Sequence, residues 1–295
     1  MEQTAEKRVA VVMPRLSRYG GAEGFAWRLA EALAAEGRSV DFVCARAETE
    51  PPSGVRVLAL GRFGPLRWRK VLGFARAAEA TVAQGGYALT FDLGKTGLQD
   101  VVRVGGGPLP TFWKHSIRAW PPGPARALKM LRRRLNPASR AILAVEQRQF
   151  RAPGAVFCVS HLVRDWLLEC HPGLDPDIVR VVYNRPDLER FSPPTDEERA
   201  SWRKAAGTVP DQRIIATAAT NFRLKGVEPL IRALALLPED CVLHVAGGRG
   251  SRAYRRLAAR LGLAERVRFL GRVEDMRAFY GAADLFVLPT FYDAC

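Results

Sequence analysis

The residues best suited to chemistry lie in a short basic loop, TNFRLKG, at positions 220–226. The loop follows an apolar run that predicts a strand, and it precedes a pattern typical of a helix. Asn221, Arg223 and Lys225 are therefore expected at the carboxyl end of a strand, beside a helix N-terminus that favours negative charge. Cations placed there can hold a diphosphate, and Gly226 eases the turn into the helix.

The next strand–helix connection, AGGRGS at positions 246–251, repeats this design. Gly247 and Gly248 allow a ligand to approach the backbone closely, and Arg249 adds positive charge. Taken singly, each of the two loops is also a sequence typical of a plain tight turn. Only together with a third strand end of the same sheet do the two loops favour a ligand-binding site.

That third strand end carries an acid. The ending ADLFVLPTFYDA contains a predicted strand over 285–288, and Asp293 follows it. The carboxyl ends of parallel strands meet at one edge of a sheet, where open α/β folds place their ligands. Lys225, Gly247 and Asp293 are therefore predicted to share one site.

The N-terminal part begins with a strand–helix–strand unit. Apolar runs at 9–13 and 40–45 enclose a helical pattern over 25–35, which predicts a parallel sheet. Between the first strand and the helix, PRLSRYGGAEGF places Gly20 and Gly21 at a turn whose backbone N–H groups suit an anion. The turn lacks G-x-G-x-x-G spacing, so a flexible connection without a ligand is the alternative.

Two domains are predicted, at 1–195 and 196–295, because the passage NRPDLERFSPP is typical of an interdomain linker. Strands and helices alternate again after this passage. The predicted fold class is α/β, with two doubly wound domains. The second domain is only half wound where the sequence stops, so we expect it to be incomplete.

Charge is the least ordinary feature of the composition. The 295 residues include 45 Lys plus Arg against 30 Asp plus Glu, a formal net charge of +15. Basic residues gather between 62 and 70 and again, beside aromatic ones, between 114 and 151, which suits the headgroup boundary of a membrane. A solvated helix face is the alternative interpretation. Nucleic acid is not expected, because no recognisable nucleic-acid-binding motif accompanies the charge.

Hydrophobicity, the N-terminal charges and the cysteine spacing bear on the protein's cellular location and on metal binding. No apolar stretch is long enough to span a bilayer, and the N-terminus has acids where a signal peptide has bases, so we expect a cytoplasmic protein. Five scattered cysteines lack paired ligand spacing, so no metal site is predicted.

Several motifs together resemble the GT-B nucleotide-sugar glycosyltransferases of the large retaining group. They are GGAE at 20–23, VVYNRPDLERF at 181–191, the K-G of NFRLKG, the VAGG turn and the ADLFVLPTFYDA ending. The likeness runs through nearly the whole chain. The layout from GLQDVVRVGGG to FCVSHLVRDWL is most similar to the lipopolysaccharide core glucosyltransferase branch.

The resemblance implies two Rossmann-like domains facing a cleft, with the donor site in the second and the acceptor site in the first. Lys225 matches the family lysine that holds the donor diphosphate, whereas Arg223 is displaced from the usual arginine position, now Leu224. Asp293 matches the first acid of a family pair whose second member would fall beyond Cys295. The expected catalytic residues are Lys225 and Asp293. The expected donor site consists of Gly20, Gly21, Asn221, Arg223, Lys225, Gly247 and Asp293.

Acceptor contacts are harder to place, because related enzymes carry an Asp where this chain has glycines at 105–107. The nearest charged residues are Asp100 and Arg103, and His115 is a substitute candidate. The expected acceptor or membrane contacts are Asp100, Arg103, Lys114, His115, Arg132, Arg133 and Arg134.

The predicted function is transfer of a hexose, with retention, from a nucleotide diphosphate sugar to a saccharide acceptor. The donor is expected to be a UDP-sugar, and no cofactor is expected. The acceptor is expected to be lipopolysaccharide core or another lipid-linked glycan, at the inner face of the cytoplasmic membrane. The competing hypothesis is an inactive fragment, or a degenerate scaffold that serves as a basic membrane- or nucleic-acid-binding protein.

Overall fold

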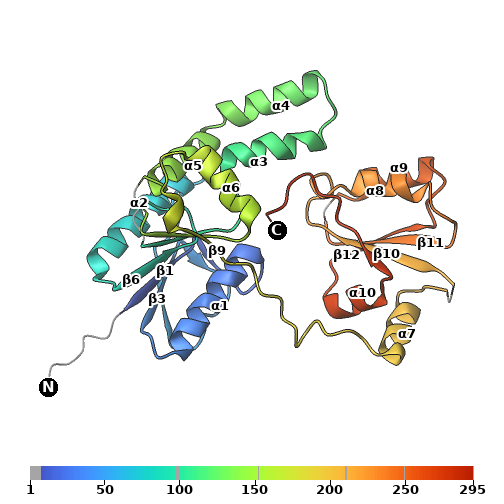
Figure 1. Cartoon of the computed structure of the whole chain (residues 1–295), viewed down its shortest axis with the longest axis horizontal. Coiled ribbons are helices and arrows are strands. Elements are labelled where there is room, and N and C mark those ends of the chain that lie inside the picture. The colour runs from blue at the N-terminus through green and yellow to red at the C-terminus, as the bar shows by residue number, and fades with distance from the viewer. Residues whose placement is uncertain (1–7, 98–99, 152, 210, 249, 295) are drawn as a thin grey trace. The chain divides into compact units, whose positions relative to one another are not determined.

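The computed structural model describes residues 8–97, 100–151, 153–209, 211–248 and 250–294. They form two compact units (Figure 1). The first contains the described residues up to Lys114, then Pro122–Asn184 and Ala294. The second contains His115–Pro121 and the described residues of Arg185–Asp293. The domain boundary near residue 195 stays a prediction.

The first unit is built on a seven-stranded parallel sheet in the order β5-β3-β1-β6-β7-β8-β9. A two-stranded ladder pairs β2 with β4 beside it. Chain order runs outward in both directions from β1, so a topological switch point lies between β1 and β6. The strands are β1 (Val9–Val12), β2 (Arg15–Leu16), β3 (Val40–Cys44), β4 (Arg46–Ala47), β5 (Val55–Ala59), β6 (Leu89–Asp92), β7 (Val101–Val104), β8 (Ala155–Cys158) and β9 (Val179–Val181).

Helices cover both faces of this sheet, which explains why its central strands are continuous apolar runs. In β1, Val11 packs on the α1 side with Ala26, whereas Val12 packs on the α2 side with Phe74. The helices in this part of the chain are α1 (Gly21–Ala35), α2 (Arg67–Gly85), α3 (Leu109–Ser116), α4 (Pro124–Leu135), α5 (Pro137–Gln149) and α6 (His161–Cys170), with 3-10 turns at Ile117–Ala119 and Pro176–Ile178.

The second unit is built on a four-stranded parallel sheet in the order β12-β11-β10-β13. Its core joins α8 and α9 to one face of the sheet, through Ile231, Leu243 and Leu257 among others. Phe279 of α10 packs with Ala216 and Ala246 of β10 and β11. The elements are α7 (Asp196–Ala205), β10 (Arg213–Ala218), α8 (Val227–Leu234), β11 (Cys241–Ala246), α9 (Arg252–Arg260), β12 (Val267–Gly271), α10 (Met276–Ala282) and β13 (Leu285–Phe286).

The predicted α/β class with parallel sheets is confirmed, and the differences are shifted element ends and elements that were not predicted. The helix predicted to start at Phe25 starts at Gly21, because Gly20 adopts φ 96° and turns the chain into the helix at once. The strand predicted over 285–288 pairs only at Leu285 and Phe286. Strand β5 and helix α2 were not predicted.

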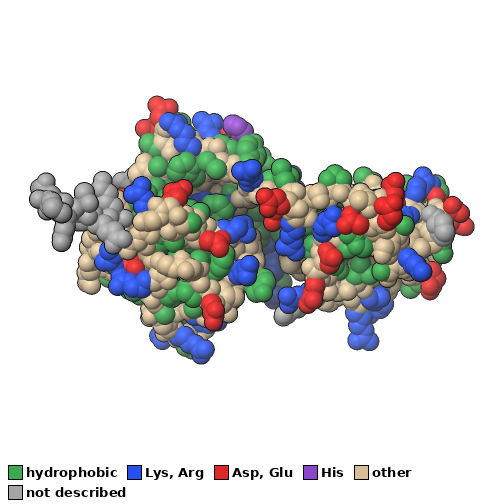
Figure 2. All heavy atoms as spheres, turned by 90° about the horizontal axis from the view of Figure 1, so that it is seen from below, with side chains coloured by type: hydrophobic (Ala, Val, Ile, Leu, Met, Phe, Trp, Pro, Cys, Tyr) green, Lys and Arg blue, Asp and Glu red, His purple; other side chains and the backbone are tan. Residues whose placement is uncertain are grey.

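No helix among the described residues is long and apolar enough to cross a membrane. Basic and acidic side chains are interspersed on the face drawn in Figure 2, despite the net positive charge. On that face the excess of Lys and Arg is therefore not concentrated in one continuous basic surface.

Candidate functional site

Two of the predicted donor residues of the second unit, Lys225 and Gly247, line one pocket. Its volume is about 600 Å³, and it lies at the carboxyl ends of β10, β11 and β12. This is the edge where parallel sheets present backbone N–H groups and loops to a ligand. The pocket is lined by Ala218, Ala219, Thr220, Lys225, Ala246, Gly247, Gly248, Arg272, Val273 and Met276.

The loop that carries Lys225 is held in shape by its own polar groups. The Asn221 side-chain oxygen accepts a hydrogen bond from the Leu224 N–H at 3.1 Å, and the Asn221 carbonyl accepts one from the Lys225 N–H at 3.0 Å. Asn221 therefore shapes the loop, and Lys225 is the predicted donor residue of this loop that lines the pocket.

Glycine is required where this loop enters α8. Gly226 has φ 71°, and a Cβ atom there would lie 2.0 Å from the carbonyl oxygen of Pro289. Next to this contact, the Phe291 N–H donates to the Leu224 carbonyl at 2.9 Å. The loop after β13 is thus fastened to the loop after β10, and only a residue without a side chain fits between them.

This fastening brings Lys225 and Asp293 into an ion pair. The Lys225 ammonium donates to the Asp293 carboxylate, and their side chains are 23% and 31% exposed. Helix α8 starts just after Lys225, and its dipole adds positive potential at the same place. In its first turn the Val227 N–H donates to the Phe222 carbonyl at 3.0 Å, and Pro229 has no N–H. The arrangement presents a partly exposed cation, an acid and a helix N-terminus together.

A second glycine brings the β11 loop close to the pocket. Gly247 has φ 78°, and a Cβ atom there would lie 2.7 Å from the Ala219 carbonyl oxygen. Its N–H donates to the Gly271 carbonyl at 2.5 Å, which joins the loops after β11 and β12. Gly247 therefore lines the pocket as predicted, whereas Arg249 lies outside the described residues.

Arg272 is a pocket residue that the sequence analysis missed. It follows β12 directly, is exposed, and makes no ion pair within 4.0 Å among the described residues. The signal was present: a basic residue directly after the strand VRFLG, at a fourth strand end of the same sheet. Among the described residues that line the pocket, the cations are Lys225 and Arg272.

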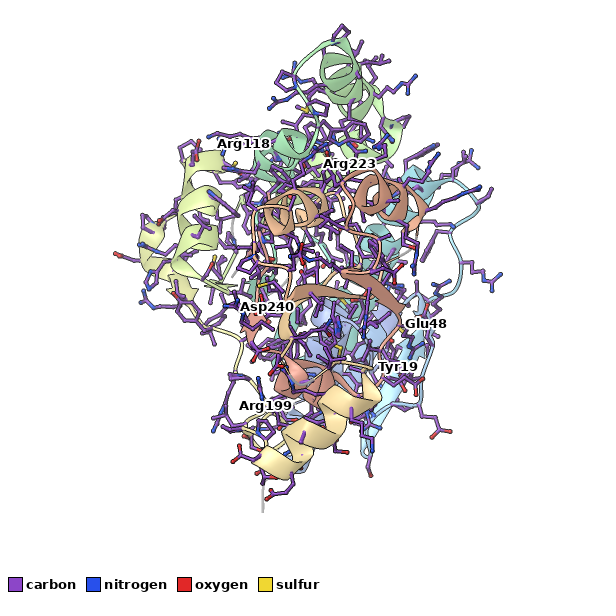
Figure 3. All side chains as sticks on the ribbon, turned by 90° about the vertical axis from the view of Figure 1, so that its right-hand side faces the viewer. Tyr19, Glu48, Arg118, Arg199, Arg223 and Asp240 are labelled. Carbon is purple, nitrogen blue, oxygen red and sulfur yellow. The ribbon has the colours of Figure 1, made fainter. Side chains whose placement is uncertain are left out.

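Arg223 takes a different direction from Lys225. Its guanidinium lies 4.3 Å from the centre of the Trp120 ring, within the second unit, and it does not line the pocket. Figure 3 labels Arg223 after β10 and Asp240 before β11, at opposite ends of these neighbouring strands. Asp240 pairs there with Arg213 at 2.7 Å, so the amino edge of the sheet carries its own ion pair.

In the first unit, Gly20 and Gly21 form the N-terminus of α1, as predicted for an anion-binding turn. The N–H groups of a helix's first turn have no intrahelical partner. Glu23 occupies this first turn, and its carboxylate accepts from Arg15. The turn therefore presents the backbone N–H groups of the first turn of α1 beside Glu23, whose negative charge Arg15 offsets.

The loop after β6 is stabilised by buried carboxylates. Asp92 accepts from the N–H groups of Gly94 and Thr96, each at 2.6 Å. Burial raises the pKa of Asp92 to about 6, although these hydrogen bonds oppose the shift. Buried Glu146 accepts from Lys95 at 2.6 Å and from the Leu109 N–H at the start of α3. These bonds hold the switch-point loop in place.

Asp100 and Arg103 are engaged in contacts within the first unit. Asp100 precedes β7, and its carboxylate accepts from the N–H and hydroxyl of Thr90 at 2.9 and 2.7 Å. This places it at the amino edge of the sheet, so its position gives no support to a role in acceptor binding. Arg103 donates to Asn184 at 2.7 Å, and its guanidinium lies 3.7 Å from the Phe25 ring centre.

The remaining predicted contacts lie on or near α3 and α4. Lys114 pairs with exposed Glu169 at 2.9 Å, and the His115 ring centre lies 6.5 Å from that of Tyr292. Arg133 lies over the Phe112 ring, and partial burial lowers its pKa. Arg132 and Arg134 are exposed on α4. No group of three or more His, Cys, Asp or Glu suited to a metal occurs among the described residues.

Two parallel α/β units, one with an anion-suited pocket at its strand ends, define a GT-B glycosyltransferase fold. The crystal structure of WaaG, a glycosyltransferase involved in lipopolysaccharide biosynthesis, has this fold: the TM-score is 0.79 and the identity 19%, over 97% of this chain and 76% of that one. The crystal structure of Anabaena HepE in complex with UDP and glucose is also similar. Its TM-score is 0.64 and its identity 18%, over 96% of this chain and 74% of that one.

The chain belongs to Glycosyltransferase Family 4, whose family model matches residues 19–190. The model described as Glycosyl transferases group 1 matches residues 211–295. Among curated relatives, D-inositol 3-phosphate glycosyltransferase of Mycobacterium sp. (strain KMS) is 34% identical over 142 residues, 46% of this chain and 31% of that protein. Lipopolysaccharide glucosyltransferase WaaG of Escherichia coli K12 is 29% identical over 127 residues, which are 42% of this chain and 31% of that protein. The matched segments thus span about a third of these relatives' length.

Proposed function

We propose that this chain carries the donor site of a retaining hexosyltransferase that uses a nucleotide diphosphate sugar, with a UDP-sugar as the expected donor. The observation that carries the proposal is the pocket where Lys225, Arg272 and the N-terminus of α8 lie at the carboxyl edge of one parallel sheet. These groups favour negative charge in one place. A side chain at Gly247 would collide with the Ala219 carbonyl, so glycine lets the loop after β11 form part of the pocket wall.

The chemistry follows from what these groups can neutralise. The bond between the sugar C1 and the diphosphate oxygen breaks, and its electron pair leaves with the diphosphate. The acceptor oxygen bonds to C1 on the same face, and its proton passes to the departing diphosphate. Lys225 and Arg272 offset the growing charge, an effect worth several kcal/mol where water is excluded. Asp293 would orient the sugar hydroxyls, and the proposal includes no metal or organic cofactor.

The test is to measure binding and turnover with the chain of 295 residues. Calorimetry with UDP, GDP and UDP-glucose reports the donor base, and NMR of the sugar released or transferred reports its anomeric configuration. Binding of a nucleoside diphosphate, with an α-product from an α-donor, supports the proposal. Absence of all nucleotide binding would overturn it and leave the inactive-scaffold hypothesis. RNA binding that UDP does not displace, and that falls steeply with salt, would favour a nucleic-acid role.

The acceptor we propose is a lipid-linked saccharide, such as lipopolysaccharide core, at the inner face of the cytoplasmic membrane. Support comes from α4, which has no buried residue. Leu128, Leu131 and Leu135 are exposed along it, and Arg132 and Arg134 are exposed beside them. A helix with exposed leucines and several arginines suits the boundary between acyl chains and anionic headgroups.

A charge-reversal experiment tests this membrane contact. Arg132, Arg133 and Arg134 are replaced together by Glu, and binding to phosphatidylglycerol vesicles is measured. The matched control replaces three exposed arginines of α9 by Glu, which changes the net charge equally; these are Arg252, Arg256 and Arg260. Loss of binding only in the α4 variant supports the contact. Equal loss in both variants would show that net charge alone drives binding, and no loss would contradict the proposal.

A further inference from the structure

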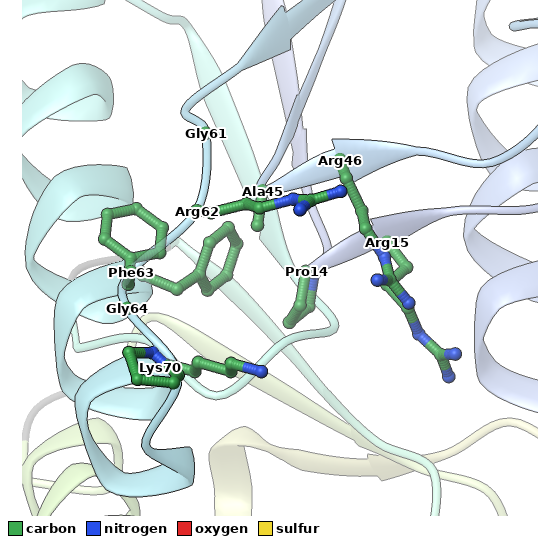
Figure 4. A pocket seen from close by; sticks show the side chains of 11 residues that line it. Pro14, Arg15, Ala45, Arg46, Gly61, Arg62, Phe63, Gly64 and Lys70 are labelled. Carbon is green, nitrogen blue, oxygen red and sulfur yellow. The ribbon is translucent and has the colours of Figure 1, made fainter.

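A second pocket lies in the first unit, at the carboxyl ends of three neighbouring strands. Pro14, Ala45 and Gly61 follow β1, β3 and β5, and all three line this cavity of about 660 Å³ (Figure 4). The pocket is therefore at the edge where open parallel sheets bind ligands. None of the residues predicted for the donor or acceptor site lines it.

The base of the pocket is apolar and its rim is basic. Phe74 is buried, and Phe63 and Pro14 are partly buried. Among the residues that the structure describes, the lining includes four cations and no acid, and the cations are Arg15, Arg46, Arg62 and Lys70. In Figure 4 the side chains of Arg62 and Lys70 extend from the left-hand loop and helix into the space around Pro14.

Only part of this positive charge is neutralised by the protein. Arg15 pairs with Glu23, and Arg46 pairs with Glu48 at 2.5 Å. Neither Arg62 nor Lys70 makes a side-chain hydrogen bond or ion pair with any residue in the described ranges. Four cations against two acids leave an excess of two positive charges around one cavity. Like charges gathered without a counter-ion are unfavourable, and an anion bound between them removes that cost.

We propose that this pocket binds a phosphate monoester, with the phosphate between Arg62 and Lys70 and the carbon skeleton against Phe63. A monoester carries about −1.5 to −2 at pH 7, which matches the two unpaired cations. A lipid phosphodiester carries about one negative charge and would leave one cation unmatched. Arg offers paired N–H donors to phosphate and Lys a point charge, a combination that proteins use for this group.

The ligand we assign is the acceptor, and this assignment rests on the proposed function. The pocket adjoins the N-terminus of α1, because Arg15 of the rim pairs with Glu23 in the first turn of that helix. A molecule held by its phosphate in this pocket lies beside the turn of Gly20 and Gly21, at the same sheet edge. The substrate class that follows is a lipid-linked saccharide whose sugar part carries a phosphate monoester.

The test compares D-glucose 6-phosphate, orthophosphate and D-glucose as probes, by calorimetry on the 295-residue chain. The variant is Arg62→Gln with Lys70→Gln; both side chains are exposed, so the fold is expected to persist. The matched control is Arg69→Gln with Arg76→Gln, which removes the same charge from α2 outside the pocket lining. The dissociation constant for glucose 6-phosphate is expected to rise at least about tenfold in the pocket variant and stay unchanged in the control.

Three outcomes would overturn the assignment. In the first, the affinity for glucose 6-phosphate falls equally in the pocket variant and the control. In the second, the wild-type protein binds glucose 6-phosphate no more tightly than glucose. In the third, the pocket variant keeps its affinity for glucose 6-phosphate and loses only its binding to phosphatidylglycerol vesicles. The last outcome would give the pocket to a lipid headgroup. UDP affinity, measured on the same proteins, reports separately on the proposed function: the pocket variant is expected to keep it.

Discussion

Lys225 donates a charged hydrogen bond to Asp293, a residue 68 positions further along the chain. The two side chains come from the loops after β10 and β13, which are neighbouring strands of one sheet. Both remain partly exposed, so their mutual attraction contributes at most about 1 kcal/mol to stability. The pair is better suited to ligand binding than to holding the fold together.

Replacing Lys225 and Asp293 separately should give opposite results for nucleotide binding. Lys225→Ala removes a cation from the diphosphate site, so UDP affinity should fall on the order of tenfold to a hundredfold. Asp293→Asn removes the acid that competes with the diphosphate for Lys225, so UDP affinity should be kept or rise. Sugar transfer should nevertheless fall in Asp293→Asn, if the acid orients the hexose. Calorimetry with UDP and turnover of UDP-glucose measure the two effects.

The control for this pair is Arg232→Ala on α8, an exposed arginine that pairs with Glu228 four residues earlier. It removes a cation from the helix that follows Lys225 without touching the pocket lining. Equal loss of UDP affinity in Arg232→Ala would show that Lys225 acts only through net charge. Unchanged UDP affinity in Lys225→Ala would remove this lysine from the donor site.

Arg272 provides an independent test of the donor pocket, because the sequence analysis did not propose it. Arg272→Ala is expected to weaken UDP binding about tenfold, and Arg272→Lys to recover part of that loss, since charge persists without the paired donors. Thermal stability should not change, because the side chain is exposed and unpaired among the described residues. Arg256→Ala on α9 is the control. A UDP affinity as high in Arg272→Ala as in wild type would exclude this residue from binding.

Gly226 should be essential for stability, and a matched glycine separates its two roles. Gly226→Ala faces both a positive φ of 71° and a Pro289 carbonyl oxygen 2.0 Å from the new Cβ. Gly262→Ala faces a nearly equal φ of 72° in open space. The conformational cost alone is about 1 kcal/mol, so Gly262→Ala should lose about that much in urea unfolding and Gly226→Ala at least about twice as much. Equal losses would contradict the crowding beside Pro289.

Much of the fold was predictable because its strands are buried on both faces. The run VAVV is continuous and apolar, CVLHVA is apolar apart from His244, and each is a strand of a parallel sheet. The gathering of Lys225, Gly247 and Asp293 at one edge also followed, since parallel strands end together. Family membership could be expected from the GGAE, K-G and VAGG motifs, and the family comparison confirms it.

Other features depend on contacts that a single sequence does not reveal. Asp100 is a charged residue near a glycine-rich run, yet it bonds to Thr90 at the amino edge of the sheet. The edge follows from the sequence, because Asp100 precedes the strand VVRV and a residue before a parallel strand lies at the amino edge, but the bond to Thr90 does not. The basic run from Arg62 to Lys70 is visible in the sequence, but its pocket was not predicted, because β5 was not predicted and its neighbours were unknown.

The last prediction concerns acid sensitivity and His244 of β11. This side chain is 2% exposed, and its Nε2 atom has no hydrogen-bond partner among the described residues. Burial, with Arg268 and Arg203 nearby, lowers its pKa to about 4. The unfolded chain takes up a proton below about pH 6.5, whereas the folded chain resists it until about pH 4. Stability should therefore fall as pH decreases between these values, by up to about 3 kcal/mol.

Replacing His244 by Leu should flatten that dependence. At pH 7.5 the variant should be as stable as wild type or slightly more so, because a buried polar atom without a partner is removed. The measurement is hydrogen exchange of the β11 amides at several pH values from 7.5 to about 4.5, which reports on the second unit directly. His161→Leu, at an exposed histidine in the first unit, is the control. A wild-type pH slope in His244→Leu, or an equally flattened slope in His161→Leu, would assign the acid sensitivity to other groups.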